Sequence, residues 1–119
     1  RTGIECSVRL EPSDMVLDKD RSTTIFRVFQ ETLTNVLRHA GATRVDVSLV
    51  TTGSRVDLKV KDNGKGIARK DLLNAKSFGL IGVRERVHFW GGTAMIRGAR
   101  NRGTTVTVRI PLQSKGRQS

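Results

Sequence analysis

The sequence has few of the residues on which several protein classes depend. Among 119 residues it has one cysteine, Cys6, so a disulfide framework and an intramolecular cysteine metal cage are excluded. A reducing, cytosolic setting is therefore expected. No apolar run approaches the roughly 20 residues of a membrane-spanning helix, and no signal-peptide pattern opens the chain. Position 1 is Arg and not Met, which predicts a piece cut from a longer polypeptide.

Aromatic and acidic residues are also scarce. The chain has no Tyr, one Trp and four Phe, whereas nucleic-acid readers that stack bases need exposed aromatic side chains. Eleven acidic residues stand against 22 Lys and Arg, which gives a net charge of +11, and none follows Glu85. This excess indicates a polyanionic partner such as nucleic acid, an acidic protein or phosphate groups, or a solvated basic surface. We expect no direct nucleic-acid binding as the main role.

What is present suits one compact domain. A chain of 119 residues can bury a single hydrophobic core and is too short for two. Hydrophobic residues make up 36% and charged residues 28%, as in soluble globular folds. We expect residues 1–112 to form the domain and residues 113–119 a flexible tail, because the tail has nothing to bury.

Alternating apolar residues predict five strands. The first covers residues 3–11 and is expected to be half-buried, with Ile4, Cys6, Val8 and Leu10 on one side and Cys6 as a small core residue. Residues 45–49 and 56–60 follow, with a turn at Thr52-Gly53 between them. Residues 93–98 and 104–110 predict a closing hairpin.

Two segments have helical periodicity. The first covers residues 21–40, with an N-cap at Asp18 or Asp20, a stop at Gly41, and one apolar arc formed by Ile25, Phe26, Phe29, Leu33, Val36 and Leu37. The second covers residues 79–90 and ends at Gly91-Gly92, with an apolar face formed by Leu80, Val83, Val87 and Trp90. Residues 67–78 lack a period and are expected to form a mobile loop. The order predicts an α+β two-layer sandwich, a mixed sheet with its helices on one face.

Four groups of residues carry possible chemistry. On the first helix, Glu31, Asn35 and Arg38 are spaced i, i+4, i+7, with His39 adjacent. Glu and Asn offer the hard oxygens that Mg²⁺ prefers, and Arg38 and His39 are suited to phosphate oxygens. A polar stripe that only faces water is the alternative.

A second group is the run DNGKG at residues 62–66, directly after an apolar strand. It leaves the carboxylate of Asp62 at a cavity rim, where it can accept from an exocyclic amine and so select adenine over guanine. Gly64 and Gly66 permit close approach of a ligand. An ordinary turn is the alternative.

The last two groups are glycine motifs. Gly79 and Gly82 bracket the start of the second helix, whose N–H groups form a seat for phosphate. Gly103 and Thr104 enter the last strand, where a tight turn and β-propensity also account for them.

In this order the groups resemble the Bergerat-fold ATPases, the superfamily that contains gyrase, heat-shock 90 chaperones, mismatch-repair ATPases and sensor histidine kinases. The amino-acid sequences of the motifs are similar to those of the histidine kinases, in the nitrate-sensor-like branch. The similar stretches are FQETLTNVLRHA at residues 29–40 (N box), DNGKGI at 62–67 (G1 box), GLIGVRERV at 79–87 (G2 box) and GTTV at 103–106. The resemblance covers residues 26–111. The phenylalanine-rich F box of many sensor kinases is missing, and the stretch between the G1 and G2 boxes is short.

The resemblance implies a role for each matching residue. Asn35 would ligate Mg²⁺ directly and Glu31 through water, and these two would be the catalytic residues. The adenine amine would bind Asp62, supported through water by Thr104. The remaining ATP-binding residues would be Arg38, His39, Gly64, Lys65, Gly66, Ile67, Gly79, Leu80 and Gly82.

The resemblance also implies the setting of the domain. It would hold Mg-ATP for autophosphorylation of a histidine on absent dimerisation helices of the same parent protein, and would not be competent alone. A response regulator would be the partner of the parent. The domain would be cytoplasmic, with attachment of the parent to the inner membrane left open. An ATP-gated switch or anti-sigma-type serine kinase of the same superfamily, or a basic nucleic-acid-binding module, are the alternatives.

Overall fold

The computed structural model describes residues 3–14, 16–35, 41–65, 80–98 and 101–112. Its strands are β1 (Glu5–Glu11), β2 (Arg44–Thr51), β3 (Arg55–Asp62), β4 (Thr93–Gly98) and β5 (Thr104–Pro111), and its described helices are α1 (Lys19–Asn35) and α3 (Leu80–Phe89). The strand order is β1-β2-β3-β5-β4. The β1–β2 pair is parallel and the other three pairs are antiparallel, so the predicted mixed sheet is confirmed.

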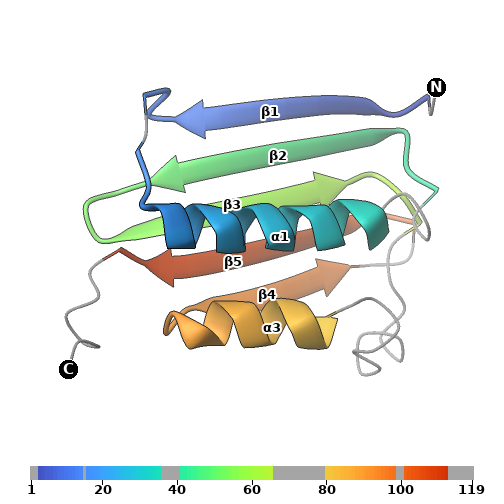
Figure 1. Ribbon diagram of the computed structural model, residues 1–119. Helices are drawn as coiled ribbons and strands as arrows, with labels where there is room; N and C mark the ends of the chain where they lie inside the picture. Colours follow the sequence, from blue (N-terminus) through green and yellow to red (C-terminus); the bar gives the residue numbers. More distant parts are fainter. Residues whose placement is uncertain (1–2, 15, 36–40, 66–79, 99–100, 113–119) are drawn as a thin grey trace.

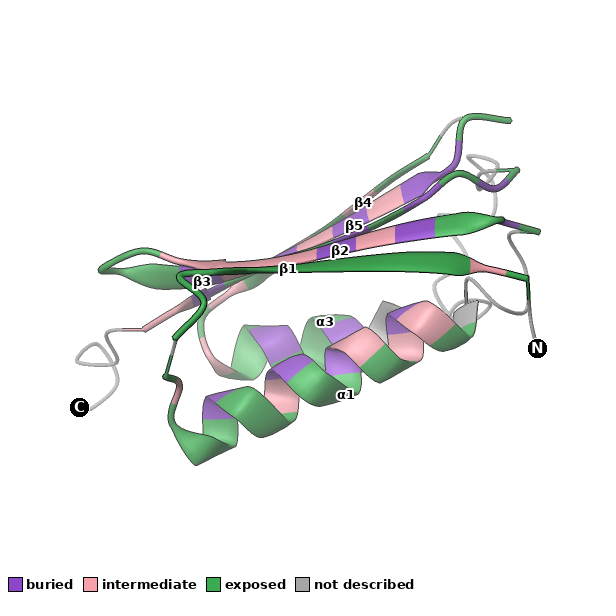
Figure 2. Ribbon diagram, turned by 90° about the horizontal axis from the view of Figure 1, so that it is seen from above, coloured by how far each residue is buried: buried purple, intermediate pink, exposed green. Residues whose placement is uncertain are grey.

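Both described helices cover the same face of the sheet, as Figure 2 shows. The core lies between this face and the helices. Its sheet side consists of alternate residues of β2, β3 and β5, and its helix side comes from Ile25 and Val28 of α1 and from Val83 and Val87 of α3. The predicted two-layer α+β architecture is therefore confirmed. Neither described helix is both long and apolar enough to cross a membrane.

The first strand is more exposed than the sequence predicts. Every residue of β1 is exposed, including Cys6, and Val8 keeps 64% of its surface accessible. The reason is position: β1 is an edge strand, and α1 packs on β3 and on α3 instead of covering it. The expectations of a half-buried strand and of a core cysteine are wrong. Phe26, placed on the apolar arc of α1, is also 56% exposed.

The helix ends follow local chemistry. Asp18 caps α1, because its Oδ2 accepts from the backbone N–H of Arg21 at 3.0 Å. Gly91 has φ of +76° and terminates α3, where the N–H of Gly92 donates to the carbonyl of Val87 at 3.0 Å. Of the two predicted N-cap residues, Asp18 and Asp20, the structure selects Asp18, and the predicted terminator at Gly91-Gly92 is confirmed.

A buried arginine joins the two helices at the end where α1 begins. The Arg21 guanidinium lies 4.4 Å from the centre of the Trp90 ring, and its Nε donates to the Pro111 carbonyl at 2.9 Å. Trp90 in turn donates from Nε1 to Thr24 Oγ1 at 2.9 Å. This cation–π and hydrogen-bonded group ties α1, α3 and the end of β5 together. The opposite end of the sheet lies near the C-terminal end of α1 and the N-terminal end of α3 (Figure 1).

Candidate functional site

The residues of the predicted site meet where β3 ends and β5 begins. Asp62 is the last residue of β3 and pairs in register with Thr104, the first residue of β5. Both are on the helix-covered face and both are buried, with 4% and 7% of their surface exposed. The C-terminal end of α1 and the N-terminal end of α3 lie at this same end (Figure 1). The buried carboxylate therefore belongs to the end of the sheet at which α1 ends and α3 begins.

The carboxylate of Asp62 is held by the glycine segment that follows it. Its Oδ1 accepts from the backbone N–H of Gly64 at 2.8 Å. Burial raises the pKa of Asp62, while the backbone N–H groups of Gly64 and Thr104 act in the opposite direction. An additional hydrogen-bond donor stabilises a carboxylate that is shielded from water more than it stabilises an exposed carboxylate. This geometry suits recognition of a ligand N–H group.

Gly103 is required by a close approach of two backbones. A Cβ at this position would lie 1.9 Å from the carbonyl oxygen of Asp62, and the residue has φ of +83°. Both features exclude other residues without a shift of the main chain. The sequence attributed this glycine to a tight turn, and the structure adds that it allows β5 to begin directly against Asp62.

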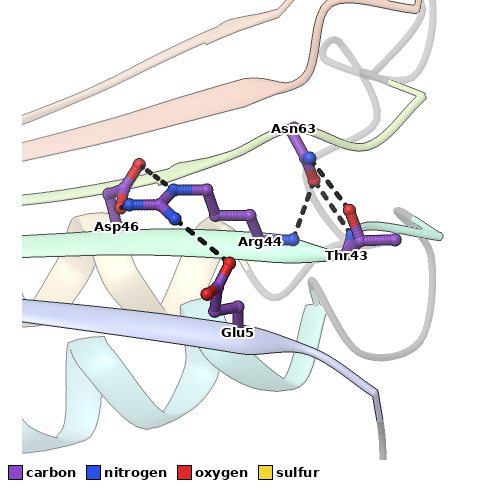
Figure 3. Close-up of polar contacts among 5 residues, drawn as sticks. All are labelled: Glu5, Thr43, Arg44, Asp46 and Asn63. Atoms are coloured by element: carbon purple, nitrogen blue, oxygen red, sulfur yellow. Dashed lines mark hydrogen bonds and ion pairs between the residues drawn. The ribbon is translucent and has the colours of Figure 1, made fainter.

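Asn63 connects the end of β3 to the start of β2 (Figure 3). Its Oδ1 accepts from the backbone N–H groups of Thr43 at 3.0 Å and Arg44 at 2.9 Å, and its Nδ2 donates to Thr43 Oγ1 at 3.0 Å. The backbone N–H of Asn63 donates to the Arg44 carbonyl at 3.2 Å. Sequence reasoning missed this role because Asp-Asn-Gly also suits a plain turn, and the only signal was an amide side chain beside the carboxylate.

The Arg44 side chain extends this network across the outer face of the sheet. Its guanidinium pairs with Asp46 at 3.0 Å and with Glu5 of β1 at 3.2 Å (Figure 3). At the other end of the glycine segment, the carbonyl of Lys65 accepts from the backbone N–H of Asn101 at 2.7 Å. The segment 62–65 is thus bonded to β2, to itself and to the turn before β5.

The helix residues of the predicted site are only partly described. Glu31 is half-buried on α1, and Asn35 is the last residue of that helix. Leu80 opens α3, and Gly82 is half-buried in its first turn with open space where a Cβ would be. Lys65 is exposed. Arg38, His39, Gly66, Ile67 and Gly79, and the predicted loop 67–78, lie outside the described residues.

The side-chain oxygens of Glu31 and Asn35 are of the kind that suits a hard cation whose remaining coordination positions are filled by water and phosphate. In the described part of the chain, no three His, Cys, Asp or Glu side chains gather into a metal-binding group. Mg²⁺ needs only one or two protein oxygens when phosphates and water supply the rest. The carboxylate of Glu31 and the amide of Asn35 are residue types that meet this need.

Comparisons with known proteins identify one ATPase family and several sensor histidine kinases as similar to this chain. Residues 20–114 match the family described as histidine kinase-, DNA gyrase B-, and HSP90-like ATPase. The sensor histidine kinase LiaS of Bacillus subtilis is 38% identical over 83% of this chain and 27% of its own length. The oxygen sensor histidine kinase NreB of Staphylococcus carnosus is 34% identical over 92% of this chain and 32% of its own length.

A solved structure has the same fold. The blue-light activated histidine kinase EL346 of Erythrobacter litoralis superposes with a TM-score of 0.78 and 28% identity, over 98% of this chain and 37% of that protein. The chain therefore spans about a quarter to a third of the curated relatives described above, at 27% and 32%.

Proposed function

Because the chain belongs to the family of histidine kinase-, DNA gyrase B- and HSP90-like ATPases, we propose that it binds Mg-ATP and directs the γ-phosphoryl group to a histidine of a parent sensor kinase. The observation that carries the proposal is the buried carboxylate of Asp62, held by Gly64 at the end of β3. The acceptor histidine belongs to dimerisation helices of the parent protein, and a response regulator receives the phosphoryl group.

On the adenine side, Asp62 accepts from the exocyclic amine and Thr104 supports it from the neighbouring strand. A carboxylate accepts from an amine and has no donor for a carbonyl when ionised, so the site favours adenine over guanine. Gly64 is buried beside this pair, and a residue without a Cβ permits close approach of a ligand. Lys65 and Gly66, which follow in the sequence, also belong to the proposed ATP-binding residues.

On the phosphate side, Asn35 and Glu31 provide oxygens for Mg²⁺, directly and through water. The metal neutralises charge on the phosphates when bound. Arg38 and His39 contact phosphate oxygens, and Gly79, Leu80 and Gly82 offer backbone N–H groups at the start of α3. Phosphoryl transfer requires positioning and charge neutralisation more than covalent help from the protein, which suits so small a set of residues.

The test is calorimetric titration of Mg-ATP into the protein and into Asp62→Ala. Loss of a charge-assisted hydrogen bond is expected to weaken binding about ten- to a hundredfold. Asp57→Ala is the matched control, because Asp57 belongs to the same strand and faces the opposite side of the sheet, where it pairs with Arg55. Equal affinity of Asp62→Ala and the unaltered protein would contradict the adenine assignment.

A further inference from the structure

We propose that Asn63 is a positioning residue for nucleotide binding: its side-chain amide clips the end of β3 to the start of β2 and so holds the carboxylate of Asp62 in place. The inference rests on the proposed function of the site. It concerns a residue that touches neither the adenine nor the phosphates in that proposal and acts through its neighbour.

The clip, by which we mean the hydrogen bonds of the Asn63 side-chain amide to Thr43 and Arg44, adds to the strand pairing where β3 leaves the sheet. The register between β2 and β3 ends at the pair Val45–Asp62, because the chain turns into its glycine segment after Asp62. The planar amide of Asn63 then takes the place of a strand backbone, with Oδ1 accepting from two successive N–H groups of the partner strand. One side chain therefore extends the pairing beyond the last backbone hydrogen bond, which the Asn63 N–H donates to the Arg44 carbonyl.

The clip matters for Asp62 because the main chain there is held from both sides. On the β5 side, Gly103 lets the backbone approach so closely that a Cβ would meet the Asp62 carbonyl oxygen at 1.9 Å. On the β2 side, the contacts to residue 63 are the Asn63 amide and the bond from its N–H to the Arg44 carbonyl. Without the amide, the backbone that carries the Asp62 carboxylate is held on that side only by strand pairing and by the N–H bond of residue 63, so it can shift more easily.

The clip also joins the two halves of the proposed site along the chain. Thr43 and Arg44 belong to the segment that leads from α1, which carries Glu31 and Asn35, into β2. Asn63 thus bonds the strand that ends in Asp62 to the start of the strand that follows α1 in the sequence. A rigid distance between these halves is what a nucleotide spanning both requires.

A comparison of Mg-ATP affinity with global stability distinguishes a positioning role of Asn63 from a merely structural one. Asn63 is exposed, so water replaces its hydrogen bonds in a variant and the cost to global stability is small. Asn63→Ala is expected to weaken Mg-ATP binding about tenfold with little change in the urea midpoint. Asn63→Asp retains an oxygen for both N–H groups and is expected to bind within about twofold of the unaltered protein.

The decisive experiment is a double-mutant cycle with Asp62, measured by calorimetry with Mg-ATP. If Asn63 acts through Asp62, adding Asn63→Ala to Asp62→Ala produces no further loss of affinity. Amide hydrogen exchange gives a readout without nucleotide, because the Gly64 N–H bonded to Asp62 Oδ1 is expected to exchange faster in Asn63→Ala and at the normal rate in Asn63→Asp.

The outcomes are distinguishable from failure of the proposed function. If the unaltered protein does not bind Mg-ATP, the proposed function is wrong. If it binds and Asp62→Ala weakens it, but Asn63→Ala binds normally, the positioning role alone is overturned. Full additivity in the cycle, or equal losses in Asn63→Ala and Asn63→Asp, would also overturn it.

Discussion

At the scale of single residues, the buried carboxylate of Asp62, which we propose binds adenine, lowers the stability of the fold near neutral pH. Its carboxylate is buried, and burial raises its pKa above the ordinary value of 3.8 despite the bond from Gly64. A carboxyl group whose pKa is raised in the folded state stabilises the fold most when it is protonated. That stability is present below the pKa of the unfolded chain and is lost as the pH rises through the folded pKa.

Because the stability contributed by Asp62 falls as the pH rises, the effect of Asp62→Asn is expected to depend on pH. The variant is expected to gain stability relative to the unaltered protein as the pH rises from below 3.8 to neutrality, because the neutral amide avoids the burial of a charge. Urea unfolding at a series of pH values measures the difference in free energy. A difference that stays constant, or that shrinks toward neutral pH, would contradict the assignment. In the unaltered protein, Mg-ATP binding is expected to weaken as the pH falls through the raised pKa.

At the scale of elements, Gly103 and Gly82 have different expected roles. Gly103 is required by the packing of β5 against β3, whereas Gly82 is proposed to serve nucleotide binding. Gly103→Ala places a Cβ against the Asp62 carbonyl and forces a side chain into φ of +83°. We expect a loss of more than about 2 kcal/mol in the free energy of unfolding, measured by urea titration. Gly53→Ala is the control, because Gly53 has open space at its Cβ position and no positive φ. Similar stability of the two variants would contradict the close approach.

Gly82 in α3 leads to the opposite expectation. Among the residues that the structure describes, none lies within 4 Å of a Cβ placed there, so Gly82→Ala is expected to stabilise the helix by about 0.5–1 kcal/mol. If the glycine is there to admit phosphate, the same variant binds Mg-ATP more weakly. Thermal unfolding and calorimetry on one sample measure both quantities. A variant that is more stable and binds with full affinity would remove Gly82 from the proposed site.

At the scale of the whole molecule, we expect neither histidine of the domain to accept the phosphoryl group of a nucleotide bound at the proposed site. The chain has two histidines. His39 ends the stretch proposed to serve the site, and His88 lies on α3 eight residues after Leu80, about 12 Å along the helix axis from its start. The isolated domain is therefore expected to bind Mg-ATP and to remain unlabelled by γ-labelled ATP.

Label is expected only when a second polypeptide supplies the acceptor helices of the parent kinase. Acid lability of that label distinguishes phosphohistidine from the phosphoserine of a serine kinase. Stoichiometric, acid-labile phosphate on the 119-residue chain alone would overturn the assignment of a catalytic domain that acts on a separate helix pair.

The sequence alone determined the elements and the positions of the motif residues. Strand alternation and helical periodicity are local properties, so the order of the described elements and the placement of Asp62 and Thr104 at strand ends followed without a structure. The capping chemistry of Asp18 and Gly91 is equally local.

The tertiary structure decided everything that depends on which elements become neighbours. The apolar alternation of β1 predicted a half-buried strand, but its edge position leaves Cys6 and Val8 exposed. Arg21, a charged residue, is buried because Trp90 and the end of β5 meet α1 at that point. The amide of Asn63 reaches β2 only because β3 pairs with that strand. Periodicity records which side of an element is apolar, whereas long-range pairing determines what lies against that side.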